Sequence, residues 1–156
     1  MRVRVLAVGT RMPTWVRSAC DEYLTRLQGA LPVTLTQIEP GPRRPGAEVQ
    51  TAIAAEGQRL LRTLPDRDYV IALDERGKPL STTELAGWLG ARMQDGKDLA
   101  FVIGGPDGLA PEVLARSNFT LALSRLTLPH ALVRVLLSEQ LYRAHCILTH
   151  HPYHRA

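Results

Sequence analysis

The sequence predicts an α/β domain with a mostly parallel sheet and helices on both faces. Short apolar runs typical of strands alternate along the chain with longer segments that carry apolar residues at helical spacing. Two of the strand candidates, 69–73 and 99–103, are continuously apolar, as strands are when a parallel sheet is covered on both sides. Alternation of this kind is the pattern of a sheet flanked by helices.

Each element has its own local signal. Gly9 ends the first strand, and Pro13 stands near the start of the first helix. The segment 40–46, PGPRRPG, predicts a loop, and 74–79 is also expected to be a loop. Ser81 and Glu84 have the spacing of a capping box. The predicted strands are 3–8, 33–38, 69–73, 99–103 and 119–123, and the predicted helices are 13–27, 49–64, 81–93, 111–116 and 129–148.

Length and composition restrict the class of protein. The 156 residues are expected to form one domain, 1–156, and 45% apolar with 22% charged residues is ordinary for a globular chain. We find no signal peptide and no apolar run of the roughly 18 residues that a membrane helix needs. Cys20 and Cys146 are expected to be buried free thiols in a reducing cytoplasm. The net charge of +4 permits a nucleic-acid partner without demonstrating one.

The last predicted helix is apolar around nearly its whole circumference between 131 and 148. A helix of this kind should be buried all round, yet a terminal helix in a small domain can lay only one face on the sheet. One hypothesis is a two-fold homodimer in which a second copy covers the other face. The alternative is a monomer with the helix in an unusual groove.

Three segments leave the predicted carboxyl ends of strands, where parallel α/β sheets bind ligands: 74–79, 104–108 and 124–129. Gly104 and Gly105 allow a ligand to approach the backbone closely, although the loop can equally be a simple tight turn. Its spacing fits neither a dinucleotide fingerprint nor a P-loop. Leu126 and Leu128 either line a pocket for a flat heterocycle or pack beneath their own helix.

The carboxyl-terminal part carries a second set of candidates. Glu139 and Arg143 have i,i+4 spacing, which serves either as a surface pair or as a functional pair on an apolar helix. The tail HHPYHRA is either a frayed terminus or a functional tail, with Tyr153 for base stacking, His154 for proton handling and Arg155 for an anion. No metal is expected, because the histidines lack acidic or cysteine partners at ligand spacing.

Several short motifs occur together and in order, and in combination they are specific. They are VGT at 8–10, LD at 73–74, GK at 77–78, IGGPDGL at 103–109, LSRLTLPH at 123–130, LVRVL at 132–136, EQLYR at 139–143 and HPYHR at 151–155. Over essentially its whole length the chain resembles the ribosomal RNA large subunit methyltransferase H family of the SPOUT superfamily. The resemblance implies methylation of N3 of a pseudouridine in 23S rRNA on the assembled ribosome, with S-adenosylmethionine as donor. It also implies a homodimer and a carboxyl-terminal trefoil knot, whereas general rules alone favour an unknotted sheet.

The resemblance assigns residues to two groups. The expected donor site comprises Leu73, Gly104, Gly105, Ser124, Arg125, Leu126, Thr127, Leu128 and Pro129. The positions linked to substrate binding or catalysis are Glu139, Arg143, Tyr153, His154 and Arg155. Two positions depart from the family pattern: His150, where some members have asparagine, and Arg125, which is often small or lysine.

The expected chemistry is removal of the N3 proton followed by methyl transfer. Arg143 or Arg155 would stabilise the negative charge on the base, His154 would accept the proton or order the base, and Glu139 would orient Arg143. The sequence leaves open whether the tail acts on its own chain or across a dimer. Two rival functions are a SPOUT methyltransferase that acts on tRNA and a non-catalytic ribosome-binding factor.

Overall fold

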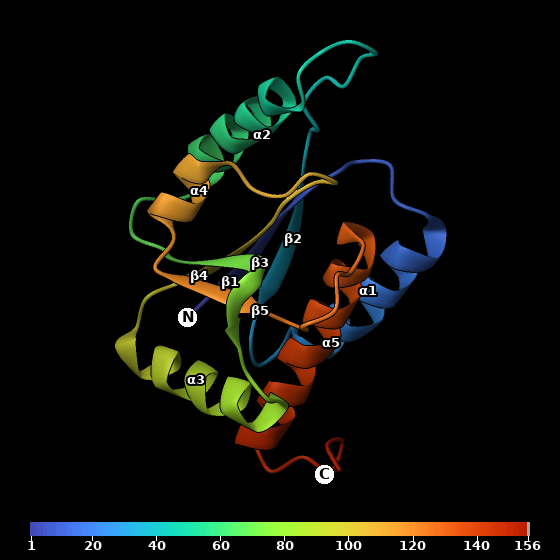
Figure 1. Cartoon of the computed structure of the whole chain (residues 1–156). Helices are drawn as coiled ribbons and strands as arrows, with labels where there is room; N and C mark the ends of the chain where they lie inside the picture. The colour runs from blue at the N-terminus through green and yellow to red at the C-terminus, as the bar shows by residue number, and fades with distance from the viewer. Residues whose placement is uncertain (156) are drawn as a thin grey trace.

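The computed structural model describes residues 1–155 and has a five-stranded parallel sheet with the strand order β2-β1-β4-β3-β5. Figure 1 shows the strands with the helices packed around them. The strands are β1 (Val3–Val8), β2 (Val33–Ile38), β3 (Tyr69–Pro79), β4 (Leu99–Ile103) and β5 (Phe119–Ala122). The helices are α1 (Thr14–Leu27), α2 (Val49–Thr63), α3 (Thr82–Asp95), α4 (Pro111–Arg116) and α5 (His130–Leu148). The predicted α/β class and parallel sheet are confirmed; the trefoil knot stays a prediction from the resemblance.

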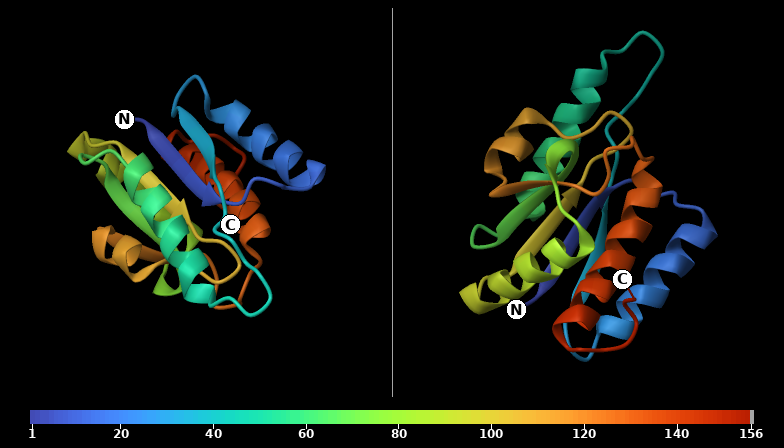
Figure 2. Two further views of the ribbon diagram at one scale, coloured as in Figure 1. Left: turned by 90° about the horizontal axis from the view of Figure 1, so that it is seen from above. Right: turned by 60° about the horizontal axis from the view of Figure 1, so that its bottom comes forward.

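The helices cover the two faces of the sheet unequally. Alternate residues of each strand point to opposite sides, so Phe101 of β4 packs in the core beneath α1, α3 and α5, while Val102 packs in the core beneath α2 and α4. The views in Figures 1 and 2 show α2 and α4 on one side of the sheet and α1 and α5 on the other. The central strand β4 is buried at all five positions, as its uninterrupted apolar run predicts.

The predicted loop at 74–79 is wrong, because β3 continues to Pro79. Its pairing with β5 shifts register after Leu73 and resumes at Lys78, opposite Leu121. At Gly77 the strand passes so close to β5 that a Cβ atom would lie 2.7 Å from the carbonyl carbon of Thr120. The polar composition of 74–79 gives no strand signal in the sequence. The segment is a strand because its backbone pairs with β5, not because it has an alternating apolar pattern.

The capping box at the start of α3 is confirmed. The Ser81 hydroxyl accepts a hydrogen bond from the Glu84 backbone N–H at 3.1 Å, and the Glu84 carboxylate accepts one from the Ser81 backbone N–H at 2.9 Å. The bond from the Ser81 backbone N–H, which reaches the carboxylate itself, contributes most to lowering the pKa of Glu84 from its ordinary value. They fix where the chain turns from the end of β3 into α3.

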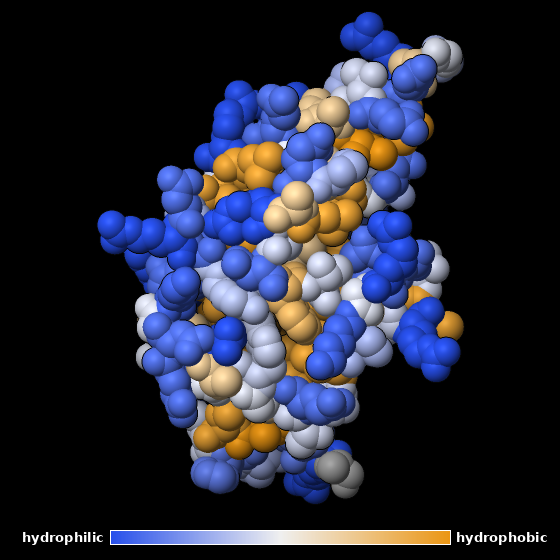
Figure 3. Space-filling model, turned by 60° about the vertical axis from the view of Figure 1, so that its left-hand side comes forward, coloured by the Kyte–Doolittle hydropathy of each residue, from blue (hydrophilic) through white to orange (hydrophobic). Residues whose placement is uncertain are grey.

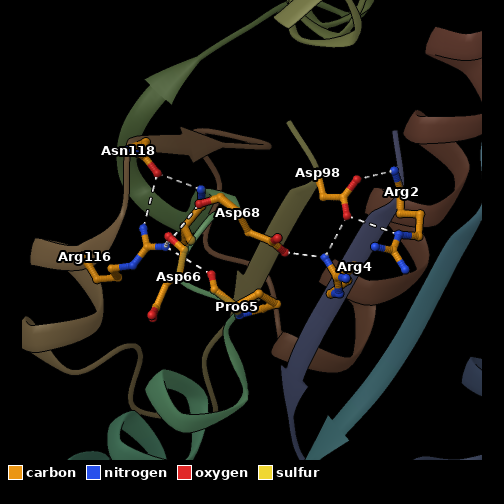
Figure 4. A network of polar contacts seen from close by, with 9 residues as sticks. Arg2, Arg4, Pro65, Asp66, Asp68, Asp98, Arg116 and Asn118 are labelled. Atoms are coloured by element: carbon orange, nitrogen blue, oxygen red, sulfur yellow. Dashed lines mark hydrogen bonds and ion pairs between the residues drawn. The ribbon is translucent and has the colours of Figure 1, made fainter. Parts of the chain in front are cut away.

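Ion pairs tie together the amino ends of the strands, the end of the sheet away from the loops that follow β3, β4 and β5 (Figure 4). Arg4 of β1 contacts Asp68, which is 5% exposed, and Asp98. Asp98 also accepts from the backbone N–H and side chain of Arg2, and the backbone bond contributes most to lowering its pKa. Arg116 donates to three carbonyl oxygens of the turn at 65–68. These contacts stabilise the sheet at the amino ends of its strands. None of them involves the opposite end, where the strands β4 and β5 terminate.

Helix α5 is only partly covered by its own chain. Leu137, Leu141 and Ala144 are fully buried against the sheet and its helices. The apolar side chains on its remaining surface are half-buried, among them Leu132, Val135, Leu136, Ile147 and Leu148. The expected burial on all sides is therefore not reached within a single chain.

Two further expectations concern the rest of the described chain. Cys20 and Cys146 are buried free thiols, as predicted. Within residues 1–155, no helix combines the length and apolar character needed to cross a bilayer. The face in Figure 3, seen after the left side of Figure 1 is turned forward, carries separate hydrophobic patches set among hydrophilic side chains.

Candidate functional site

A cleft of about 850 Å³ opens at the carboxyl ends of β4 and β5, beside residues 73–76 of β3. Its size lies within the range of about 300–1,000 Å³ that is usual for small-molecule sites. Its walls are residues 73–76 of β3, the glycine-rich loop at 104–108, the bend at 123–129 and the first turn of α5. The cleft thus lies where parallel sheets bind ligands, as the sequence predicts.

The glycine-rich loop has no room for side chains at its start. A Cβ atom on Gly104 would lie 2.7 Å from the carbonyl carbon of Gly108, and one on Gly105 would lie 3.1 Å from a methyl group of Val8. The Gly108 N–H closes the turn on the Gly105 carbonyl oxygen at 3.1 Å, and Gly108 has a φ of 87°. The loop therefore presents main-chain atoms to the cleft.

The bend at 123–129 is held by two side-chain hydrogen bonds. The Ser124 hydroxyl accepts from the Leu126 N–H at 2.9 Å, and the Thr127 hydroxyl donates to the Glu75 carboxylate at 2.6 Å. Both Leu126 and Leu128 line the cleft. Leu126 is 73% exposed, so the interpretation that it packs beneath its own helix is wrong. Its apolar surface is available to a flat ligand.

Most residues of the predicted donor site lie together in this cleft. Eight of the nine line it: Leu73, Gly104, Gly105, Ser124, Leu126, Thr127, Leu128 and Pro129. Arg125 is exposed and lies outside the lining. The lining also contains polar residues that sequence reasoning did not assign: Asp74, Glu75, Arg76, Asp107 and His130. Four of these lie in the segments 74–79 and 104–108, which directly follow predicted strands. That position was the sequence signal from which they could have been assigned to the site.

His130 begins α5 at the edge of the cleft. Its Nδ1 atom is buried and has no hydrogen-bond partner among residues 1–155. Burial lowers the pKa of His130, and the nearby Arg134 guanidinium lowers it further. Arg134 is 1% exposed and donates to the carbonyl oxygens of Val8 and Gly9, both at 2.9 Å. A neutral imidazole therefore stands at the cleft wall at neutral pH.

The predicted catalytic residues form a separate cluster on α5 and the tail. Arg143 is paired with the Glu139 carboxylate at 2.6 Å and contacts Nδ1 of His154 at 3.3 Å. The Tyr153 hydroxyl donates to Glu139 at 3.1 Å. Burial, and secondly the charge of Glu139, raise the pKa of Tyr153 to about 12, so its phenol stays protonated and remains a donor. Arg155 is exposed at the end of the described chain.

The tail reaches this cluster because the chain reverses after α5. His150 has a φ of 59°, in the left-handed region that asparagine tolerates better than histidine. Beyond it, the Tyr153 ring packs edge-on against Tyr142 at 4.7 Å, and the Arg143 guanidinium lies 4.7 Å from the same Tyr153 ring. The interpretation of a frayed terminus is therefore wrong for Tyr153 and His154. Among residues 1–155, no group of three His, Cys, Asp or Glu side chains is placed to hold a metal ion.

The cleft and the tail cluster lie at opposite ends of α5. Arg143 stands thirteen positions after His130, which corresponds to about 20 Å along a helix axis. Figure 1 shows the carboxyl terminus at the far end of α5 from the loops that form the cleft. Within one chain, the two predicted groups of site residues are therefore not brought together.

Comparison with known proteins decides the family. Residues 1–154 match the family model described as predicted SPOUT methyltransferase. The chain belongs to the SPOUT methyltransferase family. It is 49% identical, over 155 residues and 99% of both chains, to the ribosomal RNA large subunit methyltransferase H of Paraburkholderia phytofirmans. The protein of the same name from Burkholderia ambifaria is 49% identical over 156 residues and the full length of both chains.

Solved structures of low sequence identity have a similar fold. A probable methyltransferase from Bordetella pertussis superposes with a TM-score of 0.59 at 20% identity, covering 92% of this chain and 95% of that one. A probable methylase family protein from Haemophilus influenzae gives a TM-score of 0.55 at 16% identity, covering 99% of this chain and 70% of that one. The fold is thus shared with proteins of much lower sequence similarity.

Proposed function

We propose that this SPOUT methyltransferase transfers a methyl group from S-adenosylmethionine to N3 of a pseudouridine in 23S rRNA on the assembled ribosome, acting as a cytoplasmic homodimer. The observation that carries the proposal is the cleft built from main-chain atoms of the glycine-rich loop and the leucine-containing bend. Full-length relatives at 49% identity, named ribosomal RNA large subunit methyltransferase H, support the rRNA substrate.

The cleft suits an adenosyl sulfonium donor. Its apolar surfaces, including Leu126 and Leu128, match the faces of a flat heterocycle, and main-chain groups at 104–108 and 123–129 can recognise its edges. The missing Cβ atoms at Gly104 and Gly105 allow the loop to pack closely on itself, on Val8 and on Glu56, so that its main chain forms the cleft wall. Asp74, Asp107 and the neutral His130 add polar groups at the wall. S-Adenosylmethionine would supply a methyl group already activated on a sulfonium.

The chain's own task is to bind, orient and deprotonate the base. Loss of the N3 proton puts negative charge on the flanking carbonyl oxygens of the base. Arg143, fixed by Glu139, offers a guanidinium to that charge, and Arg155 can offer a second one. In the contact with Arg143 the guanidinium donates to Nδ1 of His154, which leaves the Nε2 N–H of the imidazole to order the base; His154 accepts the proton only when that contact opens. Tyr153 holds Glu139 and presents an aromatic ring for stacking.

A homodimer resolves the separation between the two groups of residues. The half-buried apolar surface of α5 is suited to contact with a second copy. Such a contact can place the tail cluster of one protomer beside the donor cleft of its partner, which a single chain does not achieve over the length of α5. Each active site would then contain residues from both protomers.

The experiment removes Tyr153 to Ala156 and compares methylation of ribosomes with donor binding by calorimetry. We expect rRNA methylation to be lost while donor affinity stays within about twofold of the full chain, because the tail lies away from the cleft. Full activity of the shortened protein would refute the role of the tail. Sedimentation showing a monomer at micromolar concentration would refute the dimer.

A second assay separates this proposal from its rivals. The purified protein is offered ribosomes or tRNA together with labelled donor, and the modified nucleoside is identified by mass spectrometry. We expect a methylated pseudouridine from ribosomes only. Label in tRNA would overturn the substrate, and absence of donor binding would point to a non-catalytic ribosome-binding factor.

A further inference from the structure

The loop between β2 and α2, residues 40–46, is anchored on a buried carboxylate. Glu56 of α2 is 2% exposed and accepts a hydrogen bond from the Gly41 N–H at 2.9 Å. Gly41 is packed so tightly against α2 that a Cβ atom there would lie 2.3 Å from the Ala52 carbonyl oxygen. The beginning of the loop is thus fixed on α2.

Arg43 of this loop links Glu56 to the glycine-rich loop of the cleft. Its guanidinium donates to Glu56 at 2.6 and 3.3 Å, and its Nε donates to the Asp107 carboxylate at 2.9 Å. It also donates to the Gly41 carbonyl oxygen at 3.3 Å. One cation therefore bridges two carboxylates that belong to α2 and to the cleft wall.

The glycine-rich loop rests on the same carboxylate. A Cβ atom on Gly105 would lie 3.4 and 3.5 Å from the two oxygens of Glu56. Asp107 and Gly105 both line the donor cleft, so Glu56 and Arg43 support that wall from behind. Figure 1 shows the β2–α2 connection at the same end of the sheet as the loop that follows β4.

We propose that Arg43 is a positioning residue for the donor cleft, which holds the glycine-rich loop in its binding conformation by bridging Glu56 to Asp107. This inference rests on the proposed function, because it takes the cleft to be the donor site. It also distinguishes Arg43 from the neighbouring Arg44. The Arg43 guanidinium is occupied by carboxylates, whereas the Arg44 side chain is exposed and forms no ion pair within residues 1–155.

The principal test replaces Arg43 with methionine, which keeps the aliphatic part of the side chain, and uses Arg44→Met as the matched control. S-Adenosylmethionine affinity is measured by calorimetry, and rates are measured with ribosomes. For Arg43→Met we expect a Kd about tenfold higher, because charge-assisted hydrogen bonds to the loop are lost. The rate at saturating donor should change less than twofold, and Arg44→Met should bind the donor like the unmodified protein.

A second readout needs no donor. Hydrogen exchange at the Gly108 amide, which closes the glycine-rich loop on Gly105, reports how well that loop is ordered. We expect faster exchange in Arg43→Met and unchanged exchange in Arg44→Met. If the unmodified protein binds no donor, the proposed function fails, while this comparison still decides whether Arg43 orders the loop.

A third variant, Asp107→Asn, keeps the proposal testable if Arg43→Met does not fold. Arg43→Met leaves Glu56 buried without its cation, whereas Asp107→Asn weakens the other half of the bridge at an exposed position. We expect Asp107→Asn to weaken donor binding and to have little further effect when it is added to Arg43→Met. Unchanged Kd and unchanged exchange in both single variants, or fully additive effects in the double variant, would overturn the proposal.

Discussion

Replacement of Gly104 with alanine tests the donor cleft at its tightest point. The added Cβ atom would lie 2.7 Å from the Gly108 carbonyl carbon, 2.8 Å from its oxygen and 3.0 Å from the Leu109 nitrogen. Ordinary contact begins near 3.4 Å, so the loop must move by about 0.7 Å. All three neighbours are backbone atoms, which leaves no flexible side chain to relieve the clash.

The cost follows from this geometry. Overpacking of this kind destabilises a fold by about 1–3 kcal/mol. If the loop relaxes instead, the donor must restore the original conformation, and the Kd should rise about 10–100-fold at about 1.4 kcal/mol per factor of ten. Calorimetry with S-adenosylmethionine and urea unfolding measure the two effects on one protein preparation.

The matched control is Gly87→Ala on α3. Gly87 is exposed, and a Cβ atom there meets nothing within 4 Å. This change should stabilise the helix by about 0.5–1 kcal/mol without altering donor binding. If Gly104→Ala binds the donor like the unmodified protein, the glycine-rich loop is not part of the donor site.

Three further predictions concern stability, all measured by urea unfolding. Ser81→Ala removes the cap of α3 and should cost about 0.5–2 kcal/mol, whereas an unchanged midpoint would show that the capping box contributes nothing. Arg134→Ala should cost about 3–5 kcal/mol, because it leaves a cavity and two carbonyl oxygens without donors; a loss below about 1 kcal/mol would contradict this. Burial lowers the pKa values of His130 and His145 from the ordinary 6.5, so below that pH the unfolded chain binds more protons than the folded one. The free energy of unfolding should therefore fall as the pH drops from 7.5 to about 5.5, and a double glutamine variant with the same slope would refute this cause.

The regular elements were predictable because their signals are local. Apolar runs such as 99–103 and the Ser81–Glu84 spacing decide strand and cap without knowledge of distant residues. The cleft was also predictable, since the carboxyl ends of parallel strands meet at one edge of a sheet. Residues 74–79 were wrongly predicted to be a loop. They belong to a strand because they pair with β5, and their sequence has no apolar pattern that would indicate it.

Polar contacts between residues far apart along the chain could not be predicted from the sequence. Arg43, Glu56 and Asp107 are far apart along the chain and meet only because two connections end at the same edge of the sheet. The buried Arg134 gave no signal either, since its partners are backbone carbonyls at the end of β1. The tail contacts with Glu139 depend on the reversal at His150, which a single sequence does not encode recognisably.

In the proposed function, helix α5 sets the spacing between the donor cleft and the Glu139–Arg143 pair. Loops can gain or lose residues at little cost, but one residue inserted into α5 would shift everything beyond it by about 1.5 Å and rotate it by about 100°. The cleft wall at His130 and the Glu139–Arg143 pair would then change their relative position, although the structure around each would stay intact. In relatives, length variation should therefore be absent between 130 and 148.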